Sequence, residues 1–208
     1  MHRRVVADDI NLFSDHARII VCGSSSSGKS FMVSKLIRKY RSQFENVILI
    51  GANLENIEDL HVIRNDDFNP VIDELNGRTL VIFDDIILNK KKLLIASESF
   101  IRSRHMKVSL VLLTQNLNLA DPSYRIISLN STHVIIFRNR DVKQISCFAR
   151  SFLENDEVKI FVELYKKTVL NVRHGYLLVD FTKNSGDPLN IRTNIADEGY
   201  ERAFKLTN

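Results

Sequence analysis

A serine-rich segment near the start of the chain has the residue types that hold a triphosphate. It reads Gly23-Ser24-Ser25-Ser26-Ser27-Gly28-Lys29-Ser30 and matches the pattern G-x-x-x-x-G-K-[ST] (Walker A). Small residues let backbone N–H groups close around a phosphate. Lys29 would reach the β- and γ-phosphates, and the Ser30 hydroxyl would ligate Mg²⁺. Because an apolar run precedes the segment and a helical pattern follows it, the sequence predicts a nucleotide-binding loop at residues 23–30.

Two carboxylates follow another apolar run. Residues 80–83 read Leu-Val-Ile-Phe and lead directly into Asp84 and Asp85 (Walker B). At the carboxyl end of a buried strand, Asp84 would hold Mg²⁺ from its outer coordination shell, and Asp85 would orient and deprotonate the attacking water. With the phosphate loop, this pair predicts an ATPase that uses ATP as substrate and Mg²⁺ as cofactor.

A polar pair, Gln115 and Asn116, ends the apolar run 108–114. A further run, Val47–Ile50, lies between the phosphate loop and Asp84, so the strand ending at Gln115 can lie between the strands that carry those two features. That order is typical of the additional-strand class of P-loop NTPases, in which a polar side chain on the inserted strand senses the γ-phosphate. The alternative is that Gln115 only ends its strand.

The elements that must position these side chains are short, nearly unbroken apolar runs separated by amphipathic stretches. Continuous hydrophobicity indicates strands covered on both faces, as in a parallel sheet between helices. The sequence therefore predicts one α/β domain, residues 1–208, with a central, mostly parallel sheet flanked by helices. The expected strands are 19–22, 47–50, 80–83, 108–113, 134–137 and 176–179. The expected helices are one that starts near Lys29 and has apolar positions from 33 to 40, and three at 90–102, 141–152 and 157–166.

Composition narrows the class of protein further. The chain has 208 residues, of which 44% are hydrophobic and 26% charged, so it can bury a core without a disulfide or metal. Cys22 and Cys147 lie far apart and lack a C-x-x-C spacing, which excludes a zinc ribbon and predicts reduced thiols. No apolar run is long enough to cross a membrane, so we expect a soluble intracellular protein. The net charge of +4 is compatible with a polyanionic partner.

Several segments together resemble the FtsK-HerA type of viral DNA-packaging ATPase. The resemblance spans residues 17–195 and is closest to the enzymes of polinton-like viruses, virophages and related double-jelly-roll-capsid DNA viruses. The spacing of Pro122 and Arg125 before Asn130 departs from the family pattern. The segments that carry the resemblance are Arg102 to Gln115, Asn130-Ser131, Val134 to Asp141 and Gly175 to Asp180.

The resemblance implies a homo-oligomeric ring of five or six subunits that hydrolyses ATP to drive double-stranded DNA, whatever its sequence, into a preformed capsid. Its partner would be a capsid vertex, and its location would be the site of virion assembly in the host cytoplasm or nucleus, or the virion itself. Transferred to this chain, the family's catalytic residues are Lys29, Asp85, Gln115 and an arginine acting in trans. For that arginine we favour Arg104, with Arg102, Arg138 and Arg140 as alternates.

Three basic clusters are candidates for contact with DNA phosphates. Such contact would be independent of sequence, because a motor must slide along any genome. The alternative for each cluster is a solvated surface, which is the usual role of charge runs on helices. The alternatives to a packaging motor are a small P-loop kinase, a helicase, or a nucleotide-gated assembly factor without turnover. The clusters are Lys35/Arg38/Lys39/Arg41, Lys90 to Lys92, and Arg138/Arg140/Lys143.

Overall fold

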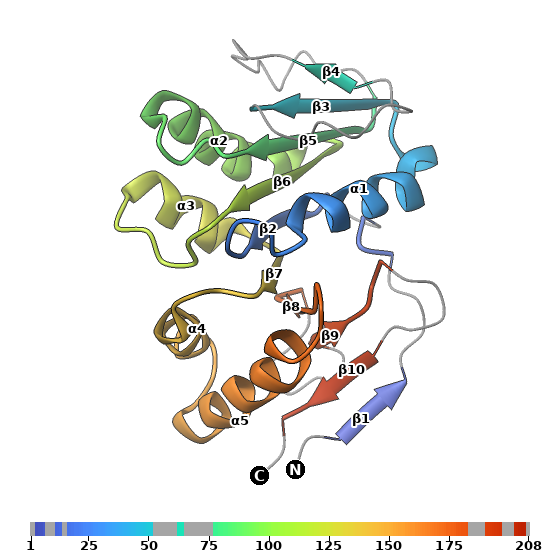
Figure 1. Ribbon diagram of the computed structural model, residues 1–208. Helices are drawn as coiled ribbons and strands as arrows, with labels where there is room; N and C mark the ends of the chain where they lie inside the picture. Colours follow the sequence, from blue (N-terminus) through green and yellow to red (C-terminus); the bar gives the residue numbers. More distant parts are fainter. Residues whose placement is uncertain are drawn as a thin grey trace.

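The apolar runs of the sequence pair into one ten-stranded sheet with the order β1-β10-β9-β8-β7-β2-β6-β5-β3-β4 (Figure 1). The computed structural model describes residues 3–6, 11–13, 16–51, 62–64, 77–182, 190–196 and 202–206. The strands are β1 (Arg3–Val6), β2 (Arg18–Cys22), β3 (Asn46–Ile50), β4 (Val62–Arg64), β5 (Thr79–Asp84), β6 (Val108–Thr114), β7 (His133–Phe137), β8 (Tyr176–Asp180), β9 (Ile191–Thr193) and β10 (Arg202–Lys205).

The sheet is parallel from β4 to β7 and antiparallel from β7 to β1. The predicted mostly parallel α/β sheet is therefore confirmed. The apolar run 176–179 forms β8, which is antiparallel to β7, with Phe137 opposite Tyr176. Its unbroken hydrophobicity reflects burial on both faces, and that burial occurs in antiparallel strands as well. Strands β1, β4, β9 and β10 were not predicted, because they have only three or four residues each.

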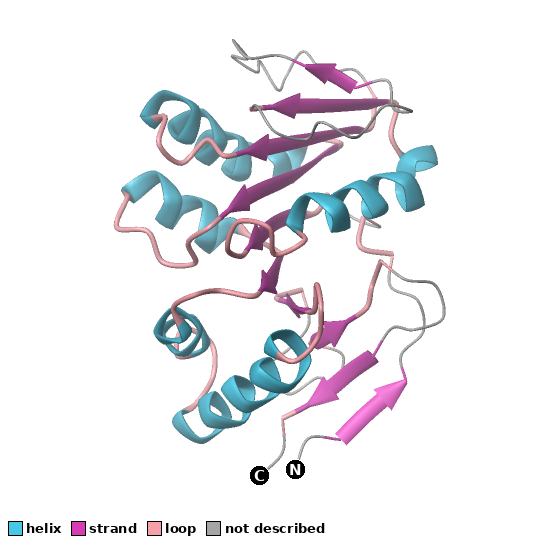
Figure 2. Ribbon diagram, viewed as in Figure 1, coloured by secondary structure: helices cyan, strands magenta, loops and turns pink. Residues whose placement is uncertain are grey.

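The helices cover the sheet unequally, with one helix on one face and the others on the opposite face (Figure 2). Residues of α1 pack with Val21 and Ile82 in one core cluster, whereas α2 to α5 pack with Ile20 and Phe83 in the other. The helices are α1 (Lys29–Tyr40), α2 (Lys90–Arg102), α3 (Pro122–Asn130), α4 (Val142–Ala149) and α5 (Asn155–Tyr165), with short helical turns at η1 (Arg41–Gln43), η3 (Ser103–His105) and the π-helical η4 (Lys166–Leu170).

Helix α3 was not predicted, because its nine residues carry too short an apolar pattern to stand out. Its start is nevertheless well specified. Pro122 occupies the first turn, and the Asp121 carboxylate accepts hydrogen bonds from the backbone N–H groups of Ser123 and Tyr124 at 2.8 and 3.3 Å. The carboxylate pairs N–H groups that would otherwise lack partners at a helix start, and proline has no N–H to leave unpaired.

The inserted strand lies where the sequence predicts it. Strand β6 pairs in parallel with β2 on one side and with β5 on the other. The register sets Cys22 opposite Thr114 and Asp84 opposite Leu113, so the three strands end level with one another. Because β5 alternates its side chains between the two faces, Asp84 follows Leu80 and Ile82 onto the face that α1 covers. Within the described residues, no helix is long and apolar enough to cross a membrane.

The two cysteines should differ sharply in reactivity. Cys22 is fully buried, and burial raises the pKa of its thiol to about 12, whereas Cys147 is exposed. Because the thiolate is the reactive form, we expect one thiol of the folded protein to react with a maleimide at pH 8 and the second to react only after unfolding. Loss of all native labelling in Cys147→Ser would confirm the assignment, and rapid labelling of two thiols in the folded protein would contradict it.

Candidate nucleotide-binding site

The segment after β2 is hydrogen-bonded to the ends of the two strands that flank β2. The Gly23 N–H donates to the Thr114 carbonyl at the end of β6, at 3.1 Å, and the Ser24 N–H donates to the Arg138 carbonyl just after β7, at 2.9 Å. A side chain at position 23 would meet the Phe137 Cβ at 2.5 Å, so only glycine fits there. The start of the loop is thus fixed to the sheet on both sides.

The rest of the loop presents backbone donors. Ser27 N–H closes a turn onto the Ser24 carbonyl at 3.2 Å, and Ser26 adopts a φ of 59°. Within the described part of the chain, no acceptor faces the backbone N–H groups of Ser25, Ser26, Gly28 and Lys29. These donors gather at the positive end of α1, which is the arrangement that binds phosphate at a helix start.

Lys29 lies over the loop that it belongs to. Its ammonium donates to the carbonyl oxygens of Gly23 and Ser24, at 2.6 and 2.9 Å. Burial lowers the pKa of Lys29, while the Asp84 and Asp85 carboxylates act in the opposite direction. These carbonyls are neutral acceptors, so a phosphate can take the ammonium from them with a gain in charge pairing.

A cleft of about 140 Å³ brings the predicted residues together. Asp84 is 7% exposed, and Asp85 and Gln115 are exposed beside it. Asp85 adopts the left-handed conformation, with a φ of 51°, which turns the chain sharply after β5 and leaves its carboxylate at the cleft. The lining residues are Ser25, Ser26, Lys29, Ser30, Asp84, Asp85, Leu113, Thr114 and Gln115.

The oxygen donors in this cleft fit Mg²⁺. Ser30 supplies a hydroxyl and Asp84 a mostly buried carboxylate, both hard ligands on the wall of one cleft. Within the described residues, no group of three or more His, Cys, Asp or Glu side chains could hold a metal alone. Mg²⁺ is normally held by one or two protein oxygens together with substrate phosphates and water, so this sparse donor set suits it.

A larger cavity of about 530 Å³ lies beyond the end of β6, lined by residues 117–122 and by Tyr124, Arg125 and Ser128. It contains neither a lysine nor a pair of carboxylates. We therefore place the chemistry in the smaller cleft, where the lysine, the hydroxyl and the two carboxylates meet.

A buried polar cluster that was not predicted links the segment after β7 to Tyr165 and to the phosphate loop. The Asn139 N–H donates to the Tyr165 hydroxyl at 2.8 Å, and that hydroxyl donates to the Phe137 carbonyl at 3.1 Å. One residue further on, the Arg140 N–H donates to the Ser24 hydroxyl at 3.2 Å. These bonds tie the segment after β7 to the phosphate loop. No local pattern predicts them, because Tyr165 lies 26 residues away from Asn139.

The arginine candidates separate into two groups. Arg138 and Arg140 are exposed in the segment that is bonded to the phosphate loop. Arg102 ends α2 and Arg104 lies in η3, both before β6 begins, so they lie at the opposite edge of the sheet from the cleft. The length of β6 alone separates that edge from the cleft by about 20 Å. Arg138 and Arg140 therefore lie near the cleft of this chain, whereas Arg102 and Arg104 lie far from it.

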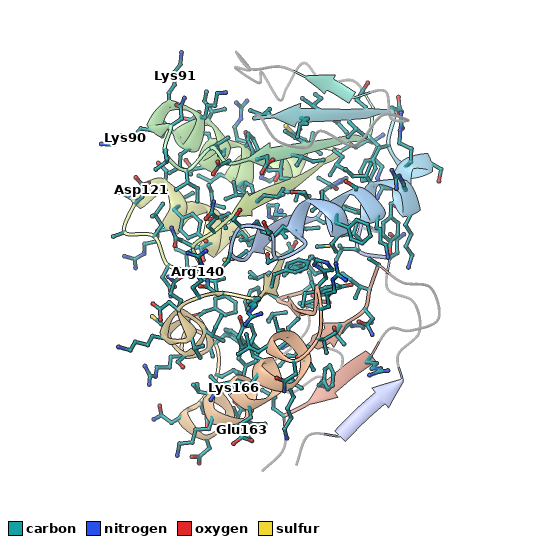
Figure 3. The ribbon with its side chains drawn as sticks, in the orientation of Figure 1. Lys90, Lys91, Asp121, Arg140, Glu163 and Lys166 are labelled. Atoms are coloured by element: carbon teal, nitrogen blue, oxygen red, sulfur yellow. The ribbon has the colours of Figure 1, made fainter. Side chains whose placement is uncertain are left out.

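The basic clusters differ in how far their cations are engaged in contacts within the protein. In the α1 cluster, Lys39 donates to the Ile195 carbonyl, Arg41 donates to the Phe44 carbonyl, and Lys35 lies 5.0 Å from the Phe31 ring centroid. Most of its cations are thus engaged within the protein. Lys90 and Lys91 instead extend outward from the start of α2, at the edge where β5 and β6 end (Figure 3).

Sequence comparisons place the chain in no family: no protein-family model matches it, and no curated protein has a significant match. Solved structures do match. The genome packaging NTPase B204 from Sulfolobus turreted icosahedral virus 2, in complex with sulfate, superimposes with a TM-score of 0.61 at 17% identity, covering 86% of this chain and 96% of that one. This chain has the fold of a genome packaging NTPase.

Two further structures agree with that fold. B204 in complex with ATP-gammaS gives a TM-score of 0.55 at 17% identity, covering 80% of this chain and 93% of B204. The cytoplasmic domain of the Thermomonospora curvata type VII secretion ATPase EccC gives 0.55 at 12% identity, covering 90% of this chain and 25% of EccC. This chain therefore matches almost the full length of B204 but only one part of EccC.

The Tyr165 hydroxyl should support the phosphate loop from below. Tyr165→Phe leaves a buried N–H and a buried carbonyl with one partner fewer, so we expect it to lower the free energy of unfolding by about 1–3 kcal/mol and to weaken nucleotide binding. Tyr176→Phe is the matched control, since its hydroxyl accepts from the Ala196 N–H instead. Urea unfolding and calorimetric titration measure the two effects. Equal nucleotide affinity in both variants would contradict a supporting role for Tyr165.

Proposed function

We propose that this protein is an ATP-hydrolysing motor that moves double-stranded viral DNA into a preformed capsid. The observation that carries the proposal is the convergence of Lys29, Asp84 and Gln115 on one cleft, produced by the insertion of β6 between β2 and β5. The likeness in fold to a viral genome packaging NTPase over 96% of that chain supports the packaging role. The specific relation to polinton-like viruses and virophages stays a prediction from the sequence.

In this mechanism the loop binds the triphosphate through its backbone donors. Lys29 leaves the Gly23 and Ser24 carbonyls and pairs with the β- and γ-phosphate oxygens, where charge builds up during transfer. Ser30 and Asp84 are the residues that would hold Mg²⁺. When bound, the ion neutralises the phosphate charge.

Asp85 and Gln115 act on the attacking water. Asp85 lies beside Asp84 at the same cleft, and its exposed carboxylate accepts the proton of the water as general base. Gln115 comes from the neighbouring strand, so its amide can contact the water and the γ-phosphate together.

Transfer of the phosphoryl group also calls for an arginine that stabilises the charge on the transferred phosphate. We assign this role to Arg104 of the adjacent subunit in a homo-oligomeric ring, because Arg104 lies at the opposite edge of the sheet from its own cleft. Such an arginine contributes on the order of 10³-fold or more to turnover.

Mixing two inactive variants tests this shared site. Arg104→Ala should bind ATP normally and lose turnover on the order of 10³-fold, and Lys29→Ala should lose nucleotide binding. A mixed ring contains interfaces where an intact loop meets an intact Arg104, so we expect mixing to restore part of the steady-state ATPase rate. Arg102→Ala is the matched control and should keep its activity. Full turnover by Arg104→Ala, or no recovery on mixing, would contradict the assignment.

The proposed DNA contact is the start of α2. The first turn of this helix carries Lys90, Lys91 and Lys92 and no acidic residue, although positive charge is unfavourable at a helix N-terminus. A phosphate backbone at this position would reverse the penalty, because it pairs with the ammonium groups and with the helix start. We therefore favour this cluster over the α1 cluster, whose cations are mostly engaged.

Removing two of these lysines should affect DNA binding and leave the fold intact. For the Lys90→Ala/Lys91→Ala variant we expect weaker binding to long double-stranded DNA and a salt dependence of log Kd that is shallower by roughly one for each lost phosphate contact. The melting temperature should not fall, because the two substitutions remove unfavourable positive charge from a helix N-terminus. Arg38→Ala removes an exposed cation from α1 and is the control. An unchanged salt dependence in the double variant would place the DNA elsewhere.

A further inference from the structure

An exposed aromatic pair stands beside the phosphate loop, outside the cleft described above. Phe31, the residue after Ser30, is 60% exposed in the first turn of α1. Its ring centroid lies 6.4 Å from that of His174, and the ring planes are inclined by 41°. A single exposed hydrophobic side chain is ordinary, but here two aromatic rings from distant segments stand together beside the phosphate loop.

The backbone holds His174 against the loop in an unusual way. His174 adopts the left-handed conformation with a φ of 55°, in a short turn closed by the Gly175 N–H donating to the Val172 carbonyl at 3.1 Å. Its Nδ1 lies 3.4 Å from the Ser27 carbonyl, and a side chain at Gly28 would come within 2.8 Å of Nδ1. The turn follows the π-helical η4, a type of segment that is frequent at functional sites.

Phe31 is likewise supported from one side. The Lys35 ammonium, one helical turn further along α1, lies 5.0 Å from the Phe31 ring centroid. Two aromatic faces that hold a planar group between them stand about 7 Å apart, twice the carbon–carbon contact distance. The observed centroid separation is 6.4 Å with the ring planes inclined by 41°, and both side chains are exposed, so turning the rings towards parallel would let one planar ring lie between them.

The sheet order places the two rings on the side of the loop where the base of a bound nucleotide would lie. Asp84 and Gln115 come from β5 and β6, on one side of β2, whereas His174 precedes β8, beyond β7 on the other side. If the γ-phosphate lies at the carboxylates, the ribose and base leave the loop in the opposite direction. They then pass the first turn of α1 and the 171–175 turn, where the two rings stand.

We propose that Phe31 and His174 bind the purine base of the nucleotide by stacking on its faces. This inference rests on the proposed function, because it takes the loop to hold the triphosphate. Stacking uses the π-face that adenine and guanine share, and it reads no hydrogen-bonding edge. The site should therefore accept ATP and GTP with similar affinity, and the aromatic pair, rather than base-specific contacts, supplies the affinity of the nucleoside part.

Comparison of ATP with inorganic tripolyphosphate, each with Mg²⁺, isolates the contribution of the nucleoside, and the ring variants then report the contribution of the base. We expect the wild-type protein to bind ATP at least about tenfold more tightly than tripolyphosphate and to bind GTP within about tenfold of ATP. Phe31→Ala and His174→Asn should each weaken ATP about tenfold and change tripolyphosphate binding less than about twofold. Asparagine is chosen at 174 because it tolerates the left-handed backbone while removing the ring.

Two controls accompany these variants in calorimetric titrations at one protein concentration. Phe31→Tyr keeps an aromatic face and should keep the preference for ATP over tripolyphosphate. Val172→Ala alters another exposed residue of the same turn and should change neither ligand.

The outcomes separate the stacking from the proposed function. Equal wild-type affinity for ATP and tripolyphosphate, or equal weakening of both ligands in Phe31→Ala and His174→Asn, would overturn the stacking and leave the phosphate site standing. A preference for ATP over GTP far above tenfold would overturn recognition by stacking alone. If the wild-type protein binds neither ligand, or Lys29→Ala binds both normally, the proposed function fails and the stacking fails with it.

Discussion

The site depends on one constraint, the pairing of β2 with a parallel strand on each side. Because β6 and β7 both bond to β2, the loop that follows has fixed anchors: Gly23 bonds to Thr114 on one side and Ser24 to Arg138 on the other. Those two bonds leave the next donors of the loop facing outward at the start of α1. The same pairing sets the end of β5 level with the loop, since β6 joins β2 to β5 in register. A shift of one residue in β6 would turn Gln115 to the other face.

Locally unfavourable features gather at this edge of the sheet. Asp85 and His174 adopt left-handed backbone conformations without being glycine, and the first turn of α2 carries Lys90 to Lys92 against the helix dipole. The strands behind them are almost fully buried, with Val21, Ile82 and Leu112 at zero exposure. A well-packed sheet can sustain such local strain, and strain of this kind concentrates where a protein binds or reacts. The contrast supports assigning both the nucleotide and the DNA to the carboxyl edge.

Much of this architecture follows from local sequence, and the exceptions have physical causes. The unbroken apolar runs identify the central strands, and the phosphate loop and Asp84 follow from residue types at fixed spacing. The order of β6 was accessible because the run 47–50 indicated an extra strand. Helix α3 was missed because its apolar pattern is short, and the direction of β8 because burial does not distinguish parallel from antiparallel pairing. Tyr165 and His174 could not be identified, because each meets the phosphate-loop region only through tertiary packing between distant segments.

The central claim is a motor whose sites are completed by neighbouring subunits on DNA. The most direct test measures the specific ATPase rate across a range of protein concentrations, with and without long double-stranded DNA, alongside the mass from light scattering. The account predicts a steep rise in specific activity at the concentration where a ring-sized mass appears, with further stimulation by DNA. Concentration-independent turnover by a monomer that is indifferent to DNA would contradict it.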